Sequence, residues 1–440
     1  MITLCVLKLF SQKRLLLMRN SVSPVRVTTC RAIFCYLIVA LFLFYEMAVQ
    51  VSPGVMTAQL MQELSLDPLG LGLMSGFYFY TYTLMQIPSG ILFDRIKPRT
   101  VICVSLIICA CGCLLFAHSH QLYTGSFARL LMGFGSAFAF VAVLVVTADL
   151  FPPRYFAFIT GITQMLAAFG AMAGQLPLGS AIDHYGWRYI MTVLAVLGVF
   201  LALVVWLLLN YEKESLTSAQ SQSSPRFTEI LRKRQTWVIA LYACLLWAPM
   251  SGFASLWGVP YLMHVFSLSH SNAALATSMM WLGLALISPI LGALSTSWKT
   301  RVWPLSLSAL AGFVAFAALI FMPQLSVIQL YAVIFFAGAA CSGQALSFTV
   351  VREINHPDQI GSAIAVNNLA VVVSGAIFQP LIGRILSNYC STDTAHSLSG
   401  CTAAHFQYGM LILLVAYGVA FILALCGIKE SFQKSRRETR

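Results

Sequence analysis

The chain of 440 residues carries 26 Lys and Arg residues against 14 Asp and Glu residues, a formal net charge of +12, yet only 9% of its residues are charged and 59% are hydrophobic. A soluble globular protein is charged at about a quarter of its positions. This composition therefore excludes a water-soluble surface and, despite the positive charge, a nucleic-acid-binding protein. The sequence predicts an all-α integral membrane protein that crosses the bilayer many times.

Twelve apolar runs predict twelve membrane-spanning helices. The spans are expected to be helical because lipid offers no partner for unpaired backbone amides, and the chain lacks the alternating pattern of barrel strands. In chain order the runs cover residues 32–52, 71–92, 100–118, 124–148, 158–181, 188–209, 236–257, 272–294, 303–322, 328–350, 360–388 and 406–428. No segment resembles a cleaved signal peptide, and Met18 can be the true start in place of Met1.

The distribution of Lys and Arg predicts the orientation of the spans. With both termini inside, 23 of the 26 basic residues fall on the inner side, and the exceptions are Arg129, Arg188 and Arg384. Loops with an excess of Lys and Arg stay in the cytoplasm. We therefore expect a multi-pass protein of the cell (inner) membrane with both termini cytoplasmic.

One long polar segment divides the chain into two parts of similar length. Its centre is rich in Ser and Gln, which is typical of a linker. The predicted organisation is a cytoplasmic amino tail at 1–31, a six-helix bundle at 32–209, a cytoplasmic linker at 210–235, a second six-helix bundle at 236–428 and a cytoplasmic tail at 429–440.

The two halves share sequence patterns. The stretch from Gly90 to Arg99 after the second span recurs as Gly292 to Arg301 after the eighth span, with Gly, Lys and Arg in register. Gln175 to Gly179 in the fifth span is echoed by Gln379 to Gly383 in the eleventh. Both pairs are separated by about 200 residues, which indicates a duplicated six-span unit and hence two pseudo-symmetric bundles.

Several of these positions resemble the motifs of the major facilitator superfamily. The matching residues are Gly90, Asp94, Arg95 and Arg99 after the second span, Arg129, Gly133 and Gly135 in the fourth span, and Gly186, Trp187 and Arg188 before the sixth. Lys97-Pro98 and Met132 depart from the family pattern, which usually has Gly-Arg and Gln there. The resemblance implies two six-helix bundles that rock about a central cavity.

Gly90, Asp94, Arg95 and Arg99 are expected to form a gating latch at the cytoplasmic face. Gly90 lets helices approach closely, and Asp94 can accept hydrogen bonds from Arg95 or from a neighbouring helix end. Such a network would hold the outward-open state and break when the cavity opens inward. The alternative is that residues 95–99 only anchor the loop on the positive side of the membrane.

Glu46 is the one acidic residue deep within a predicted span. A charge at the bilayer centre costs about 2.5–3.5 kcal/mol on insertion scales, so Glu46 is expected to face a wet cavity, to pair with a cation or to be protonated. Gln50 lies one turn further along the same face, which favours a cavity. Desolvation suits the carboxyl to carrying a proton; the alternatives are substrate binding and a structural role.

Arg129 is the natural counterpart of Glu46. The family motif implies that this arginine takes part in proton transfer or in switching between states. Because an arginine does not lose its own proton, its role would be to change the proton affinity of a carboxylate. The alternative is that Arg129 reaches the outer lipid headgroups.

Further polar and aromatic residues within the spans are candidates for lining the cavity. Tyr78 and Tyr82 share a helical face with Gln86, whereas Phe77 and Phe79 are expected to meet other helices or lipid, and mid-span amides usually find partners in the bundle interior. The candidates are Tyr78, Tyr82, Gln86, Gln164, Gln175, Trp247, Asn367, Asn368 and Gln379. For the aromatic residues, packing is the alternative interpretation.

The glycines of the fifth span resemble the antiporter motif found in exporters of the superfamily. Gly161, Gly170 and Gly174 fit that motif, but Gln175 occupies a position where the motif has Pro. Close helix packing explains the glycines equally well. A proton-driven efflux antiporter of drugs or metabolites is therefore the alternative within the transport class.

The sequence contains no motif for nucleotide hydrolysis or other catalysis, so we expect no enzyme, no cofactor and no metal site, and a proton gradient as the energy source. Cys390 and Cys401 can form a disulfide in an outer loop. We expect a monomeric secondary transporter, in contact with membrane lipids, that moves an amino acid, short peptide or organic acid by proton symport with alternating access. The alternative of another class is a transporter-like receptor that binds without transport.

Overall fold

The computed structural model describes residues 29–152, 156–209, 227–355, 360–390 and 398–432. The regular structure of these residues is helical throughout. Most of the predicted amino tail with both candidate start sites, much of the linker and most of the carboxyl tail lie outside the described residues.

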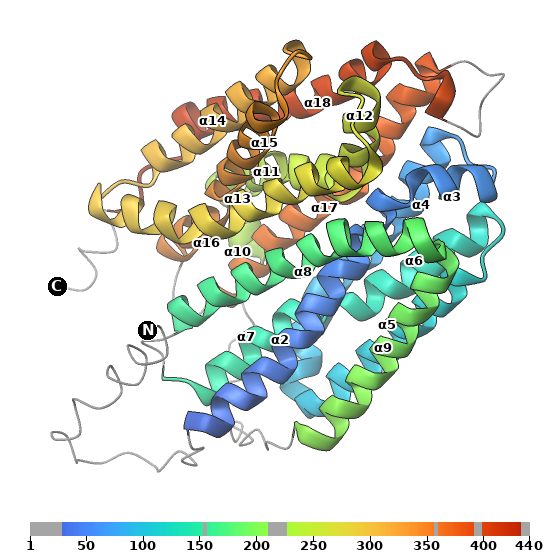
Figure 1. Cartoon of the computed structure of the whole chain (residues 1–440). Coiled ribbons are helices and arrows are strands. Elements are labelled where there is room, and N and C mark those ends of the chain that lie inside the picture. The colour runs from blue at the N-terminus through green and yellow to red at the C-terminus, as the bar shows by residue number, and fades with distance from the viewer. Residues whose placement is uncertain (1–28, 153–155, 210–226, 356–359, 391–397, 433–440) are drawn as a thin grey trace, which may run out of the picture.

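The first half of the chain forms one helical bundle, drawn from blue to green in Figure 1. Its elements are α2 (Thr29–Val51), η1 (Ser52–Val55), α3 (Thr57–Glu63), α4 (Pro68–Arg95), α5 (Pro98–Ala117), α6 (Leu122–Ser136), α7 (Ala139–Leu150), α8 (Phe156–Tyr185) and α9 (Trp187–Leu208). Short connections join most of these helices, so sequential helices run back and forth across the bundle.

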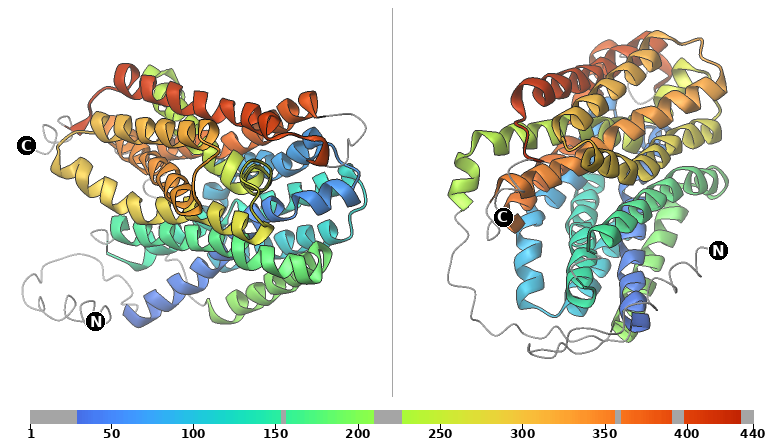
Figure 2. Two further views of the ribbon diagram at one scale, coloured as in Figure 1. Left: turned by 45° about the horizontal axis from the view of Figure 1, so that its top comes forward. Right: turned by 90° about the vertical axis from the view of Figure 1, so that its left-hand side faces the viewer.

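The second half forms a matching bundle, drawn from yellow-green to red, that lies against the first (Figures 1 and 2). Its elements are α10 (Phe227–Arg232), α11 (Arg234–Pro249), η3 (Met250–Trp257), α12 (Gly258–Val265), α13 (His270–Ser297), α14 (Val302–Phe321), α15 (Val327–Cys341), α16 (Gly343–Ile354), α17 (Ile360–Tyr389), η6 (Leu398–Gly400), α18 (Ala403–Ile422) and η7 (Leu423–Gly427). The prediction of two helical halves is confirmed.

Eleven helical segments of the described residues are long and apolar enough to cross a membrane, where the sequence predicted twelve spans. The remaining predicted span corresponds to α4, a helix of 28 residues. Its tyrosines, threonines and Gln86 make it less apolar than the others. Many of these polar side chains face protein partners rather than lipid, which is how a bundle accommodates them.

Four predicted spans are not uniform α-helices, and one of them, at 406–428, ends in the π-helix η7. The span at 124–148 is interrupted at Ala137 and Phe138 between α6 and α7, and the span at 328–350 is interrupted at Ser342 between α15 and α16. The seventh span contains the π-helix η3 between α11 and α12. The last residues of the predicted linker are helical in α10 and α11. Apolar runs do not reveal such breaks, because hydropathy is insensitive to hydrogen-bond register.

Equivalent glycines pack equivalent helices in the two halves. A methyl group on Gly133 of α6 would overlap the carbonyl oxygen of Tyr78 in α4, and one on Gly338 of α15 would overlap the carbonyl oxygen of Met280 in α13. These contacts join the fourth span to the second and the tenth to the eighth. The repeat predicted from sequence is thus also a repeat of backbone packing, in which only glycine fits.

The bundle has two ends, which we name by their residues. The basic end carries the turns at 96–97 and 298–301, and the disulfide end carries the turns at 64–67 and 266–269 and the Cys390–Cys401 disulfide. Between the halves, α4 lies along α17 and α8 lies along α13. Gly72 and Gly76 of α4 contact Gln379 and Pro380 of α17 in the part nearer the disulfide end.

Replacing Gly338 by Val should destabilise the fold by about 1–3 kcal/mol, because the added side chain would overlap the backbone of α13. A lower melting temperature of the purified protein in detergent would show this. Gly292→Val is the matched control, because a methyl group at Gly292 meets no atom within 4 Å. Equal melting temperatures of the two variants would contradict this account of the packing.

Candidate functional site

Glu46 of α2 lies wholly buried inside the first bundle, where α2 packs against α8 and α7 and also contacts α6. The hydroxyl of Tyr78 in α4 donates a hydrogen bond of 2.6 Å to Glu46 Oε1. The described residues offer no hydrogen bond to the second oxygen, Oε2. A buried carboxyl with one donor is therefore the centre of this polar cluster.

Arg129 of α6 approaches the same tyrosine from another direction. Its guanidinium lies over the Tyr78 ring, 4.5 Å from the ring centroid, which is a cation–π arrangement. Its two terminal nitrogens donate to the carbonyl oxygens of Val49 at 3.3 Å and Gln50 at 3.4 Å near the end of α2. Tyr78 thus links Arg129 to Glu46, and the described ion pairs do not include a direct one between the two charged residues.

The remaining contacts of this cluster come from α2 and α4. Tyr82 is buried and stacks on Tyr78, with ring centroids 5.9 Å apart. Gln50 is half-buried and contributes its carbonyl oxygen to Arg129. Tyr78 and Tyr82 do share a helical face, but that face points into the first bundle toward Glu46. Both side chains are buried in this structure, and Tyr78 directs its hydroxyl to Glu46, so a role for the two tyrosines in lining the cavity stays a prediction.

Two amide side chains that were predicted to line the cavity donate hydrogen bonds to the π-helix η3 instead. Gln175 of α8 donates to the carbonyl oxygen of Ala254 at 2.7 Å, and Gln379 of α17 donates to that of Ser251 at 2.8 Å. Both side chains are buried. The wider turn of a π-helix leaves carbonyl groups without their usual partners, and these two glutamines, which the sequence repeat had paired, supply donors from opposite halves.

The adjacent asparagines of α17 face different neighbours. Asn367 is buried and donates to Ser347 at 2.8 Å within the second bundle, whereas Asn368 reaches across to Gln86 of α4 at 2.6 Å. Successive residues of a helix point about 100° apart, so the two amides do not share a face. Gln164 and Trp247 are half-buried, and Trp247 packs edge-on against Trp281.

The predicted latch residues do not meet as a group among the described side chains. A methyl group on Gly90 would meet nothing within 4 Å. Arg95 is exposed, and the guanidinium of Arg99 lies 4.1 Å from the ring of Trp206 in α9. The side chain of Asp94 lies outside the described residues. The latch therefore stays a prediction.

A charged cluster that sequence reasoning missed lies at the basic end of the second bundle. Arg301, the counterpart of Arg99, is buried and binds both carboxylate oxygens of Glu353 at the end of α16. Glu430 accepts the backbone amide of Arg301 at 2.9 Å. Burial alone would raise the pKa of Glu430, but hydrogen bonds from Thr300 and from three backbone amides lower its pKa below the ordinary value.

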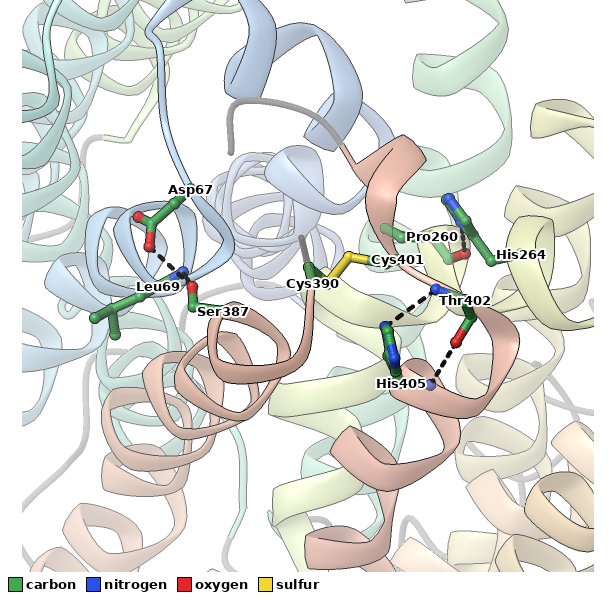
Figure 3. The surroundings of a disulfide bond; sticks show 9 residues. All are labelled: Asp67, Leu69, Pro260, His264, Ser387, Cys390, Cys401, Thr402 and His405. Carbon is green, nitrogen blue, oxygen red and sulfur yellow. Dashed lines mark hydrogen bonds between the residues drawn. A yellow bond between two sulfur atoms is a disulfide. The ribbon is translucent and has the colours of Figure 1, made fainter. Parts of the chain in front are cut away.

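At the disulfide end, the two halves are joined by side chains that nothing in the sequence singled out. Asp67 caps α4 and accepts a hydrogen bond of 2.8 Å from Ser387 of α17, and Ser387 in turn accepts the amide of Leu69 (Figure 3). Cys390, directly after α17, and Cys401, just before α18, form a disulfide. From sequence alone, polar residues at helix ends that join the two halves cannot be distinguished from helix caps that face solvent.

His270 makes a second connection at this end. Its Nδ1 lies 2.8 Å from a carboxylate oxygen of Asp183 in α8, and its Nε2 lies 2.9 Å from the carbonyl oxygen of Val55 in η1. Gly54 of η1 is so close to the backbone of Ser255 in η3 that an added methyl group would lie 2.7 Å from the Ser255 oxygen. The two halves are thus closed against each other at the disulfide end.

Two six-helix halves around buried charged groups define the class of the protein as a polytopic membrane protein of the transporter type. The sequence profile of the Major Facilitator Superfamily matches residues 35–378 and 250–440. The chain belongs to this family.

Similar proteins are transporters. The chain is 21% identical over 384 residues to the gentisate transporter of Corynebacterium glutamicum, covering 84% of this chain and 83% of that protein. It is 30% identical over 143 residues to probable anion transporter 7 of Oryza sativa subsp. japonica, and the match spans only 32% of either protein. A solved structure of a bacterial homologue of the human lysosomal transporter Spinster, inward-facing and unoccupied, superposes with a TM-score of 0.76 at 19% identity, covering 93% of this chain and 98% of that one.

Replacing Tyr78 by Phe should destabilise the protein by about 1–3 kcal/mol, because both oxygens of the buried Glu46 would then lack a donor. The melting temperature in detergent reports this loss. Tyr82→Phe is the matched control, since the stacked ring of Tyr82 is kept and its hydroxyl has no hydrogen bond to Glu46 among the contacts described above. A Tyr78→Phe variant as stable as Tyr82→Phe would show that the bond to Glu46 contributes nothing.

Proposed function

We propose that this protein is a secondary active transporter that imports a small organic acid together with a proton. The observation that carries the proposal is the Glu46–Tyr78–Arg129 cluster. It places a titratable carboxyl inside the membrane-spanning part of a Major Facilitator Superfamily chain, with a fixed positive charge on the far side of one tyrosine ring.

The cluster can hold its carboxyl in two charge states. A proton on Glu46 is favoured while the carboxyl is enclosed with one unpartnered oxygen, because an unpaired buried charge is costly. Once the proton leaves, Arg129 lies close enough to stabilise the carboxylate through Tyr78 or by moving toward it. A residue that alternates between these two states as the cavity changes sides is suited to coupling proton movement to solute movement.

The substrate class rests on the relatives and on the charge of the site. The gentisate transporter and the probable anion transporter carry anions by name, and Arg129 is the fixed cation of the buried cluster. Half-buried Gln50, Gln164, Trp247 and Asn368 are our candidates for contact with the solute. Arginine and amide donors recognise carboxylates well, which favours an organic acid over an amino acid or peptide.

We infer that the structure is the state open toward the basic end. Several hydrogen bonds and the Gly54 backbone contact join the halves at the disulfide end. Nearer the basic end the Gln86–Asn368 bond crosses between the halves, but methyl groups on Gly90, Gly161 and Gly292 would meet nothing within 4 Å. The Spinster homologue, which has a similar fold, is in an inward-facing conformation in its solved structure. We place the basic end in the cytoplasm, in accordance with the basic loops.

The alternatives have less support. Gly170 and Gly174 of the antiporter-like pattern contact the backbone of Phe44 and Ala48, so close packing accounts for them without an efflux function. A surface groove of about 360 Å³ between α5 and α9 is lined by apolar residues such as Leu114 and Val199. We propose that lipid acyl chains fill this groove and that the protein acts as a monomer.

In proteoliposomes with an inward proton gradient, the wild-type protein should accumulate labelled gentisate or another small carboxylate. Glu46→Gln should abolish accumulation but retain exchange of labelled for unlabelled solute, because an amide neither binds nor releases a proton near neutral pH. Filtration uptake assays with and without a protonophore measure both properties.

A labelled nucleoside is the matched control solute, and it should not accumulate. Carboxylate uptake that ignores the proton gradient, or gradient-driven accumulation by the Glu46→Gln variant, would contradict proton symport through Glu46. Gradient-driven loss of solute from preloaded vesicles would identify an exporter, and binding without flux would identify a receptor.

A further inference from the structure

His270 is the first residue of α13, and its ring bridges the two halves at the disulfide end. On one side Nδ1 lies 2.8 Å from Asp183 of α8, and on the other side Nε2 lies 2.9 Å from the carbonyl oxygen of Val55. Both partners belong to the first half, and His270 belongs to the second. The imidazole therefore lies in the contact that must break when this end opens.

Both ring nitrogens face hydrogen-bond acceptors. A carbonyl oxygen and a carboxylate accept but do not donate, and a neutral imidazole has only one N–H group. Neutral His270 beside ionised Asp183 would point one nitrogen lone pair at an oxygen lone pair. The observed contacts are satisfied only when the pair holds one additional proton, carried either as an imidazolium or on the Asp183 carboxyl.

The site is open to protons from the aqueous side. The side chains of His270 and Asp183 are 22% and 39% exposed, whereas Glu46 is completely buried. Gly179 packs 3.5 Å from the ring, measured from a methyl position on that glycine to Cε1. This position leaves the pair in contact with water while the backbone around it is fixed.

Several other charged groups near this end have partners of their own, and Arg384 of α17 is exposed. Arg188 of α9 pairs with Glu63 of α3 at 3.0 Å, and Asp67 caps α4. The ring of His184 in α8 packs on Tyr185. On α12, which packs against α13, His264 directs Nδ1 to its own helix at Pro260 (Figure 3). Among the described residues, Asp183 is therefore the charged group that faces His270.

We propose that His270 and Asp183 form a second proton-binding site, distinct from Glu46, whose protonation closes the transporter at the disulfide end. Histidine changes charge between about pH 5 and pH 8, so acidic conditions at this end stabilise the closed contact and alkaline conditions weaken it. A role for this proton in solute import rests on the proposed function. The dependence of closure on pH does not.

Double electron–electron resonance (DEER) distance measurements on the full chain in lipid nanodiscs test this site without any solute. Spin labels at Tyr123→Cys of α6 and Ile328→Cys of α15 report on the disulfide end, since both positions are 82% exposed and lie in opposite halves. The exposed cysteines Cys30, Cys111 and Cys426 are replaced by Ser. From about pH 5.5 to about pH 8, the ratio of short to long distances should fall about tenfold, as expected for the loss of one charge-assisted hydrogen bond.

Two variants separate this site from other titrating groups. His270→Gln should remove the pH dependence and favour the long distance at both pH values. Asp183→Asn should also remove the pH dependence, but by keeping the short distance at both pH values. At the higher pH the amide introduced at this position can donate a hydrogen bond to the neutral imidazole, so the closed contact is retained. His184→Gln is the matched control and should respond to pH as the wild type does.

A wild-type ratio that does not change with pH, or a pH response retained by His270→Gln, would overturn the proposal. An Asp183→Asn variant that opens with rising pH like the wild type would overturn it as well. Because no solute is present, failure of the uptake experiment and failure of this one are independent results.

Discussion

The hydrogen bond from Tyr78 to Glu46 is the interaction on which this account depends. An acidic side chain enclosed in a membrane-spanning bundle is costly unless its oxygens find donors, and the structure provides one short bond from α4. Arg129 lies over the same tyrosine ring, so one aromatic side chain fixes the relative positions of three helices. In the proposed mechanism, a change in the protonation of Glu46 would therefore alter the contacts of Tyr78 with α2 and α6.

The same constraint connects the site to the movement of the halves. Tyr78 lies on α4, which runs along α17 of the opposite half, and Phe79 beside it packs onto Gly375 of α17. A shift of α4 that follows proton release would therefore act directly on the interface between the halves. Such a shift would change the closed contacts at the disulfide end, which include the hydrogen bonds of His270 and Ser387.

The sequence predicted the architecture well because composition and periodicity report on it directly. Apolar runs located the helices, and the repeat between the halves anticipated two matching bundles. The sequence did not point to the backbone contacts of Gly133 with α4 and of Gly338 with α13. Glu46 stood out because an acid within an apolar run is rare. What sequence did not reveal were partners across helices: Tyr78 for Glu46, Asn368 for Gln86, and Asp183 for His270. These pairings depend on how helices rotate against each other, and residues at helix ends look alike whether they join two halves or face water.

The central claim is that Glu46 carries a proton together with the solute. Its most direct test is the pH change in the external medium when a small carboxylate that the protein transports is added to weakly buffered proteoliposomes with no imposed gradient. The account predicts that the medium becomes more alkaline as solute and protons enter together, and that Glu46→Gln vesicles show no such change. Solute entry by the wild type without alkalinisation, or the same alkalinisation with Glu46→Gln, would contradict it.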